Sequence, residues 1–219
     1  MTEISYNISM FTFVIFDLDG TLVDTIDDIH ESLNCTLKHF GFPLLKLQMT
    51  KSYVGDGMRK LVERAVGADN FSSEIETHFR KIYSENIINK TKLFDGIPEL
   101  LQELQNKQID SVVISNKSIA LTEKIIKYFH MEKTINEWYG GDSFKTKKPS
   151  PEPVLKALEN HKVENKHAIM IGDNHTDILA GSAAGIKTCF CSYGYGSIGS
   201  STPDFYADKP TELIRIISN

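Results

Sequence analysis

The sequence predicts an α/β fold in which a parallel sheet, covered by helices, is interrupted after its first strand by an all-helical segment. Beyond residue 97, segments with a strand pattern alternate with segments of helical periodicity. That alternation is typical of a parallel sheet with helices on both faces. Between residues 23 and 92, by contrast, every periodic segment is helical. A short apolar run, residues 11–16, precedes this segment and supplies the first strand.

The first strand ends in two acids. Residues 11–16 are rich in aromatic and β-branched side chains and predict a fully buried strand. Such a strand cannot carry acids in its interior at low cost, so we expect Asp17 and Asp19 at its carboxyl end. Ligands bind at that end in open α/β sheets. Taken alone, the pair is equally compatible with a turn, because Asp and Gly are common turn residues.

Three apolar stripes with helical spacing follow this strand. The first stripe is closed by Gly41 and Pro43, and the second is entered through Gly55-Asp56-Gly57. The stripes consist of Ile29, Leu33, Leu37 and Phe40, then Met58, Leu61, Val62, Ala65 and Val66, then Ile75, Phe79, Ile82 and Tyr83. We therefore expect a core domain of residues 1–22 and 93–219 and a helical cap domain of residues 23–92. Two chain crossings between them make a hinge, so the cap is expected to act as a lid.

The remaining chain supplies the rest of the core. Strands are predicted at residues 109–115, 168–171 and 187–191. Helices are predicted near residues 98–104, 121–129, 153–158, 178–184 and 213–217. Pro98 suits the first turn of a helix, and Gly185 suits the position just after a helix end.

Composition narrows the class of protein. The chain has 219 residues, 41% hydrophobic and 24% charged, with a formal net charge of −5, which argues against a nucleic-acid partner. No apolar run approaches the ~20 residues that cross a bilayer, and residues 1–10 lack the pattern of a secretory signal. Three cysteines, Cys35, Cys189 and Cys191, are an odd and sparse set typical of a reducing compartment. We expect a cytoplasmic protein with neither nucleic-acid nor membrane partners.

Polar residues stand at the ends of three of the predicted core strands. Asp17 and Asp19 follow the first strand, Ser115-Asn116-Lys117 stand at the end of the second, and Gly172-Asp173 follow the third, with Asp177 four residues further on. Lys148-Pro149 lies just before a predicted helix. Because the carboxyl ends of parallel strands share one edge of the sheet, we expect these groups to lie together.

This set of residues suits phosphoryl transfer to a carboxylate. Asp17 would attack phosphorus, and Mg²⁺ held by Asp17 and Asp173 would neutralise the phosphate oxygens. Ser115 and Lys148 would bind the same oxygens. Asp19 would give a proton to the leaving alcohol and then help water hydrolyse the aspartyl phosphate. Asp177 is placed to reach the same ion or to orient Lys148.

In these motifs the chain resembles the haloacid dehalogenase superfamily of phosphohydrolases. The four motifs are Asp17-Leu18-Asp19-Gly20-Thr21, Ser115, Lys148-Pro149, and Gly172-Asp173 with Asp177. The resemblance implies a Rossmann-like core, a helical cap inserted after the first strand, and Mg²⁺ as cofactor. It implies that Asp19 offers the metal its backbone carbonyl, so Asp19 joins Asp17 and Asp173 as a metal ligand. Gly20, Thr21 and Asn116 are expected to support the site, and an acid at position 19 favours phosphatase over dehalogenase chemistry.

Several stretches resemble the phosphoglycolate phosphatases of that superfamily. They include residues 53–65, the turn at residues 139–142, residues 148–153 and residues 193–196. The resemblance implies 2-phosphoglycolate as the favoured substrate. The cap loop with Gly55, Asp56, Gly57 and Arg59 is then expected to select the substrate, although Asp56 is an acid where Asn is usual.

Other functions use the same scaffold. A pyrophosphatase, a nucleotide or sugar-phosphate phosphatase and a β-phosphoglucomutase-type isomerase all fit the core motifs. A signalling receiver domain uses similar chemistry, but it has no cap and places its acidic pair elsewhere in the chain. A non-catalytic binding or signalling protein is a remote alternative, because every motif residue is present. A small phosphorylated metabolite is the expected partner, and the chain is expected to be a monomer or a homodimer.

Overall fold

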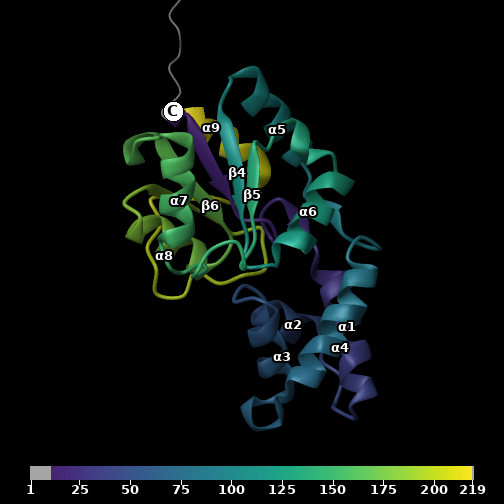
Figure 1. The fold of residues 1–219 in the computed structure, drawn as a ribbon. Coiled ribbons are helices and arrows are strands. Elements are labelled where there is room, and N and C mark those ends of the chain that lie inside the picture. Colours follow the sequence, from purple (N-terminus) through teal and green to yellow (C-terminus); the bar gives the residue numbers. More distant parts are fainter. Residues whose placement is uncertain (1–10, 219) are drawn as a thin grey trace, which may run out of the picture.

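The computed structural model describes residues 11–218, and it confirms the α/β fold with an inserted helical segment. The prediction about a secretory signal concerns residues 1–10, which lie outside the described residues. A parallel six-stranded sheet forms the centre of the core (Figure 1), and its strand order is β5-β4-β1-β6-β7-β8. Its strands are β1 (Phe13–Phe16), β4 (Asp110–Ile114), β5 (Glu137–Tyr139), β6 (Ala168–Gly172), β7 (Lys187–Cys191) and β8 (Phe205–Ala207).

Helices cover both faces of this sheet, because each buried strand carries apolar side chains on both sides. Val14 and Phe16 of β1 belong to the larger hydrophobic cluster, with residues of α5, α6 and α9. Phe13 and Ile15 belong to a second cluster, with residues of α7 and α8. These helices are α5 (Ile97–Asn106), α6 (Ile119–Tyr128), α7 (Glu152–His161), α8 (His175–Ala183) and α9 (Leu213–Ser218). The core is therefore a three-layer sandwich.

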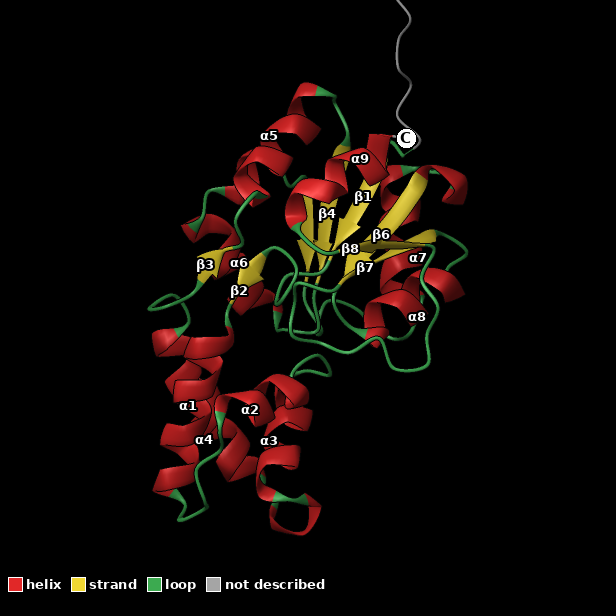
Figure 2. Cartoon of the chain, turned by 180° about the vertical axis from the view of Figure 1, so that it is seen from behind, coloured by secondary structure: helices red, strands yellow, loops and turns green. Residues whose placement is uncertain are grey.

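Four helices form a separate group beneath the carboxyl edge of the sheet, as Figures 1 and 2 show. They are α1 (Ile26–His39), α2 (Leu47–Tyr53), α3 (Met58–Val66) and α4 (Ser73–Asn86). Helix α4 begins where the Ser72 hydroxyl accepts a hydrogen bond from the Ile75 amide. It packs against α1, and the fully buried rings of Phe79 and Tyr83 lie on its inner face. The predicted bounds of the two domains stay a prediction.

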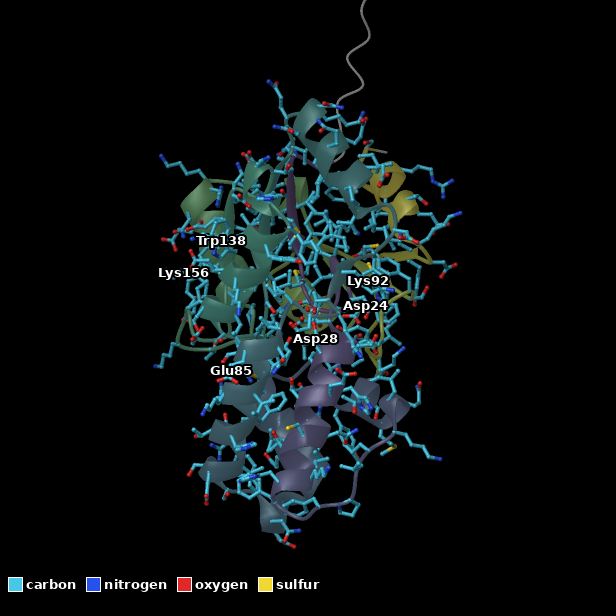
Figure 3. The ribbon with its side chains drawn as sticks, turned by 90° about the vertical axis from the view of Figure 1, so that its right-hand side faces the viewer. Asp24, Asp28, Glu85, Lys92, Trp138 and Lys156 are labelled. Carbon is cyan, nitrogen blue, oxygen red and sulfur yellow. The ribbon has the colours of Figure 1, made fainter. Side chains whose placement is uncertain are left out.

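The two chain crossings lie side by side. A short antiparallel ladder joins β2 (Val23–Asp24) to β3 (Lys92–Leu93), between the sheet and the four helices (Figure 2). Asp28, at the start of α1, lies close to Asp24 and Lys92 of this ladder (Figure 3). Its buried carboxylate accepts hydrogen bonds from the amides of Lys90 and Thr91 and from the Thr91 hydroxyl. This carboxylate therefore joins the segment that leaves the core to the segment that returns to it.

Some elements were not predicted from the sequence. Strands β5 and β8 have three residues each, which is too short for the alternation of apolar and polar residues to be recognised. Only Thr50 is buried in α2, so that helix has no apolar stripe. Trp138 is partly buried on the edge strand β5. In the described part of the chain, no helix combines the length and apolar character needed to cross a membrane.

Candidate active site

Strand register brings the predicted site residues to one edge. Phe16 at the end of β1 lies opposite Val113 of β4 and Ile171 of β6. The residues that follow these strands, including Asp17, Ser115 and Asp173, therefore emerge side by side. The Asp17 amide donates to the Ile171 carbonyl at 2.8 Å, which continues the ladder to the site itself.

Lys148 connects two of the acids. Its ammonium group lies 2.7 Å from Asp17 Oδ1 and 2.7 Å from Asp177 Oδ1, and it also donates to the Ile114 carbonyl. The contact with Asp177 is an ion pair without hydrogen-bond geometry. Burial alone would lower the pKa of Lys148, but Asp17 and Asp177 raise it above its usual value. Lys148 therefore stays charged.

Asp17 is crowded by other acids. Burial raises the pKa of Asp17 from 3.8 to about 7; Lys148 opposes this rise, while Asp177 and Asp19 add to it. In the protein alone, Asp17 is thus poised between its charged and neutral forms near neutral pH.

Asp173 is held by the backbone of a loop. Its Oδ2 accepts hydrogen bonds from the amides of Tyr195 (2.9 Å) and Gly196 (2.8 Å). Burial, with Asp17 and Asp177 nearby, raises the pKa of Asp173 well above its usual value despite these amides. Gly20 has φ +90°, and a Cβ there would lie 2.1 Å from Asp173 Oδ2. Only glycine lets this turn pass so close to the carboxylate.

Three of the carboxylates could hold a metal ion. Ligand oxygens of Asp17, Asp173 and Asp177 all lie within 4.8 Å of one another and are buried. Lys148 balances one of their three charges, so the ionised cluster has two uncompensated negative charges. A divalent cation fits this deficit, because hard cations prefer carboxylate oxygens. Asp177 was expected to reach the metal or to orient Lys148, and its carboxylate lies close enough for either role. The predicted backbone contact of Asp19 with the metal stays a prediction.

The Asp19 carboxylate has a different environment from that of Asp17. Its Oδ1 accepts a hydrogen bond from Thr25 Oγ1 at 2.7 Å, and its Oδ2 lies 3.1 Å from Lys117 Nζ. Lys117 also donates to the Tyr83 hydroxyl of α4 at 2.7 Å. Burial would lower the pKa of Lys117, but Asp19 and Tyr83 raise it above its usual value. The two predicted acids therefore have separate lysines.

The supporting residues lie around this centre. Ser115 is buried, and its hydroxyl accepts from the Lys117 amide at 3.2 Å. The Asn116 side chain donates to the carbonyls of Lys148 (3.0 Å) and Gly55 (2.9 Å). Thr21 is fully buried, and its carbonyl accepts from the Tyr193 hydroxyl at 2.9 Å. Asn116 thus connects the core to the cap.

A cavity between core and cap contains the acids. Asp17, Asp19, Ser115, Asp173 and Asp177 line its core side. The cap side is apolar and consists of Ile29, Val54, Met58, Leu61 and Phe79, with Gly55, Gly57 and the Lys117-bound Tyr83. Among the described residues, Lys117 supplies the only positive charge on the cavity wall. The core side of the cavity is therefore acidic, and its cap side is apolar.

Two of the predicted cap residues are not among those lining this cavity. The Asp56 carboxylate pairs with Arg64 at 2.5 Å. The Arg59 guanidinium lies over the Phe71 ring and 3.9 Å from Glu76, and its side chain is 65% exposed. Selection of the substrate by Asp56 and Arg59 stays a prediction, whereas Gly55 and Gly57 do border the cavity.

Several residues that contact the site had no role predicted from the sequence. Lys117 was expected at this edge with Ser115 and Asn116, but its contacts with Asp19 and Tyr83 were not predicted. Thr25 and Tyr83 reach Asp19 and Lys117 only through tertiary folding. Tyr195 and Gly196 lie in a glycine- and serine-rich loop without a local pattern, and no sequence signal assigns their amides to Asp173.

The fold and the site define a capped α/β enzyme with a buried acidic centre, and comparison with known proteins gives its family. Residues 14–191 match the family model described as haloacid dehalogenase-like hydrolase. A phosphoglycolate phosphatase from Aquifex aeolicus is 39% identical over 206 residues, which cover 94% of this chain and 96% of the relative. One from Psychrobacter arcticus is 34% identical over 192 residues, covering 83% and 84%. The chain belongs to the haloacid dehalogenase-like hydrolase family.

A solved structure gives the same result for the whole fold. The crystal structure of a predicted phosphoglycolate phosphatase from Haemophilus somnus superimposes with a TM-score of 0.87 at 27% identity. The match covers 94% of this chain and 98% of the other. The resemblance recognised from the motifs is confirmed, and it extends through both core and cap.

Proposed function

We propose that this chain is a Mg²⁺-dependent phosphatase that hydrolyses a small phosphomonoester, with 2-phosphoglycolate as the favoured substrate. The observation that carries the proposal is the position of Asp17. Its carboxylate projects from the ligand edge of the sheet into the cavity, next to two further acids and a buried lysine. The names of the relatives from Aquifex aeolicus and Psychrobacter arcticus support both the reaction and the substrate.

The metal would be held by Asp17, Asp173 and Asp177, with the backbone carbonyl of Asp19 as a further ligand. When bound, Mg²⁺ supplies positive charge to the phosphate oxygens and favours the ionised form of the carboxylates. The charge deficit of the cluster supports this choice.

In the first chemical step, one Asp17 carboxylate oxygen attacks phosphorus. The bond between phosphorus and the oxygen of the leaving alcohol breaks, and Asp19 gives its proton to that oxygen. The product is an aspartyl phosphate on Asp17. Lys148 holds the attacking carboxylate in place through the 2.7 Å contact with Oδ1.

In the second step, water attacks the phosphorus of the aspartyl phosphate. Asp19, now ionised, takes a proton from that water, and the bond between phosphorus and the Asp17 oxygen breaks. Inorganic phosphate leaves and Asp17 is restored. Thr25 and Lys117 hold the Asp19 carboxylate for this proton transfer from two sides.

The cavity wall supports a small substrate. Its cap side offers apolar side chains rather than the many polar groups that a sugar or nucleotide would need. Ser115 and Lys148 are proposed to bind the transferring phosphoryl group. We also propose a cytoplasmic location, which the exposed free thiol of Cys35 supports because such thiols persist in reducing compartments.

The proposal is tested by phosphate release with Mg²⁺ over a panel of metabolites. The panel contains 2-phosphoglycolate, pyrophosphate, hexose phosphates and nucleoside monophosphates. We expect the highest kcat/KM for 2-phosphoglycolate. A preference for a hexose phosphate or pyrophosphate would contradict the substrate, and no phosphate release from any member would contradict the reaction.

A further inference from the structure

Three side chains of the core bind three successive carbonyl groups of the cap. Asn174 donates to the Val54 carbonyl at 3.5 Å, Asn116 to that of Gly55 at 2.9 Å, and Lys147 to that of Asp56 at 2.6 Å. The carbonyls belong to the loop between α2 and α3, which borders the cavity. The contact with Lys147 is charge-assisted and therefore the strongest of the three.

Each of these donors is next in sequence to a residue of the acidic centre. Asn116 follows Ser115, Lys147 precedes Lys148, and Asn174 follows Asp173. In each loop, one residue faces the centre and its neighbour binds the cap. The position of the cap loop and the geometry of the centre are therefore fixed by the same three loops.

The glycines of the cap loop fit this contact. A Cβ at Gly55 would lie 2.3 Å from Asn174 Nδ2, and one at Gly57 would lie 2.8 Å from Lys147 Nζ and 3.1 Å from the Asn116 carbonyl. A side chain at either position would push the donors away from the carbonyls. The loop thus presents bare backbone where the core approaches it.

We infer that Asn116, Lys147 and Asn174 are positioning residues that hold the cap loop closed over the acidic centre by binding its backbone. The inference rests on the proposed function for its kinetic consequence only. Because the core contacts residue 56 through its backbone carbonyl, the side chain at this position takes no part in the contact. Asp56 can therefore be an acid, paired with Arg64, without facing the substrate.

Lys147 offers the cleanest test, because Asn116 also binds the Lys148 carbonyl and Asn174 also caps α8. Lys147→Met removes the donor and keeps the length of the side chain. Lys145→Met is the matched control, since Lys145 is an exposed lysine of the same loop. Lys147→Arg keeps a charged donor and should rescue.

Closure can be measured by energy transfer within the natural chain. Trp138, the single tryptophan, lies in the core (Figure 3), and Cys35 on α1 is the exposed one of the three thiols. An acceptor dye is attached to Cys35, and the measurement is made with Mg²⁺ and inorganic phosphate present. Under these conditions, we expect Lys147→Met to change the efficiency of energy transfer from Trp138 to the dye. Lys145→Met and Lys147→Arg should keep the wild-type value. A wild-type value for Lys147→Met would overturn the inference.

Kinetics give a second readout. Loss of a hydrogen bond from a charged donor predicts a fall of about tenfold or more in kcat/KM for Lys147→Met, with Lys145→Met unchanged. Unaltered kcat/KM would also overturn the inference. The energy-transfer result does not depend on which phosphomonoester is hydrolysed, so failure of the substrate proposal would leave it intact.

Discussion

Asp17 and Asp19 are two residues apart, yet their surroundings differ in kind. Asp17 shares Lys148 with Asp177 and lies among further acids. Asp19 lies outside that cluster, between a hydroxyl and a lysine of its own. Pairs of titratable groups in contrasting environments commonly divide acid–base work between them. The two carboxylates thus have different partners, as the different roles proposed for them, attack by Asp17 and proton transfer by Asp19, require.

Asp17→Asn should abolish turnover. The amide keeps the volume of the side chain but is not a competent nucleophile, so we expect kcat to fall by at least about 10⁴-fold. Phosphate release with Mg²⁺ is the measurement, and circular dichroism controls for folding. Activity within tenfold of wild type would contradict a covalent intermediate on Asp17.

Asp19→Asn should slow both chemical steps. Loss of a general acid–base group typically costs about 10²- to 10⁴-fold. Because the second step also needs the base, the aspartyl phosphate should accumulate when the leaving group is a good one, such as p-nitrophenol. The amount of aspartyl phosphate is measured by quenching the reaction with acid and counting the labelled phosphoryl group that stays on the protein. Rapid hydrolysis of the aspartyl phosphate, so that none accumulates, would contradict the role of Asp19 as the base.

At the scale of elements, the β2–β3 ladder and Asp28 define how the helical group joins the core. Asp28 is 1% exposed, and its carboxylate accepts from two amides and one hydroxyl of the returning chain. This carboxylate therefore stabilises the hinge more than a surface acid would.

Asp28→Ala should destabilise the protein by about 3 kcal/mol, because it leaves the buried donors of Lys90 and Thr91 without a partner. Urea unfolding measures the change. Asp27→Ala, one residue earlier on the exposed side of the same helix turn, is the control and should change stability by less than about 0.5 kcal/mol. Equal effects of the two substitutions would contradict the role of Asp28.

Elements with long periodic patterns could be predicted from sequence, and short ones could not. Helices α1, α3 and α4 each bury a regular apolar stripe, and β1 is an uninterrupted apolar run. The position of strand β8 depends on its pairing with β7, and no local sequence pattern encodes that pairing. Helix α2 buries only Thr50, so its position depends on the neighbouring helices.

For the whole molecule, the acidic centre should make stability depend on pH and metal. The pKa of Asp17 is raised from 3.8 to about 7, and that of Asp173 is raised too, both chiefly by burial. The folded protein therefore holds these protons more tightly than the unfolded chain. The resulting stabilisation is complete below about pH 4 and is lost as the pH rises through 7.

We therefore expect the metal-free protein to lose stability between pH 4 and 7 relative to Asp17→Asn, which lacks one of these protons. Urea unfolding of both proteins in EDTA measures the difference. If the free energies of unfolding of the two proteins change with pH in the same way, the raised pKa of Asp17 is contradicted. Mg²⁺ at pH 7 should raise the midpoint of wild-type unfolding, because ligand binding to the folded state stabilises it, and EDTA should stop phosphate release.

Most of the candidate site could be predicted from the residues that follow strands. Asp17, Ser115 and Asp173 come directly after β1, β4 and β6, so topology alone brings them together. The contact of Lys117 with Tyr83 spans 34 positions and joins core to cap. It depends on how the cap packs, which the order of the strands does not determine.

The β2–β3 ladder also bears on how such proteins diversify. The chain leaves the core at Asp24 and returns at Lys92, and these two residues are paired in the ladder. An inserted segment that starts and ends at one place costs the core a loop-closure entropy that grows only slowly with the length of the insert. We expect residues 26–90 to be exchangeable for helical modules of other sizes. New specificities can thus arise by replacing the cap as a unit while the strand-end acids stay unchanged.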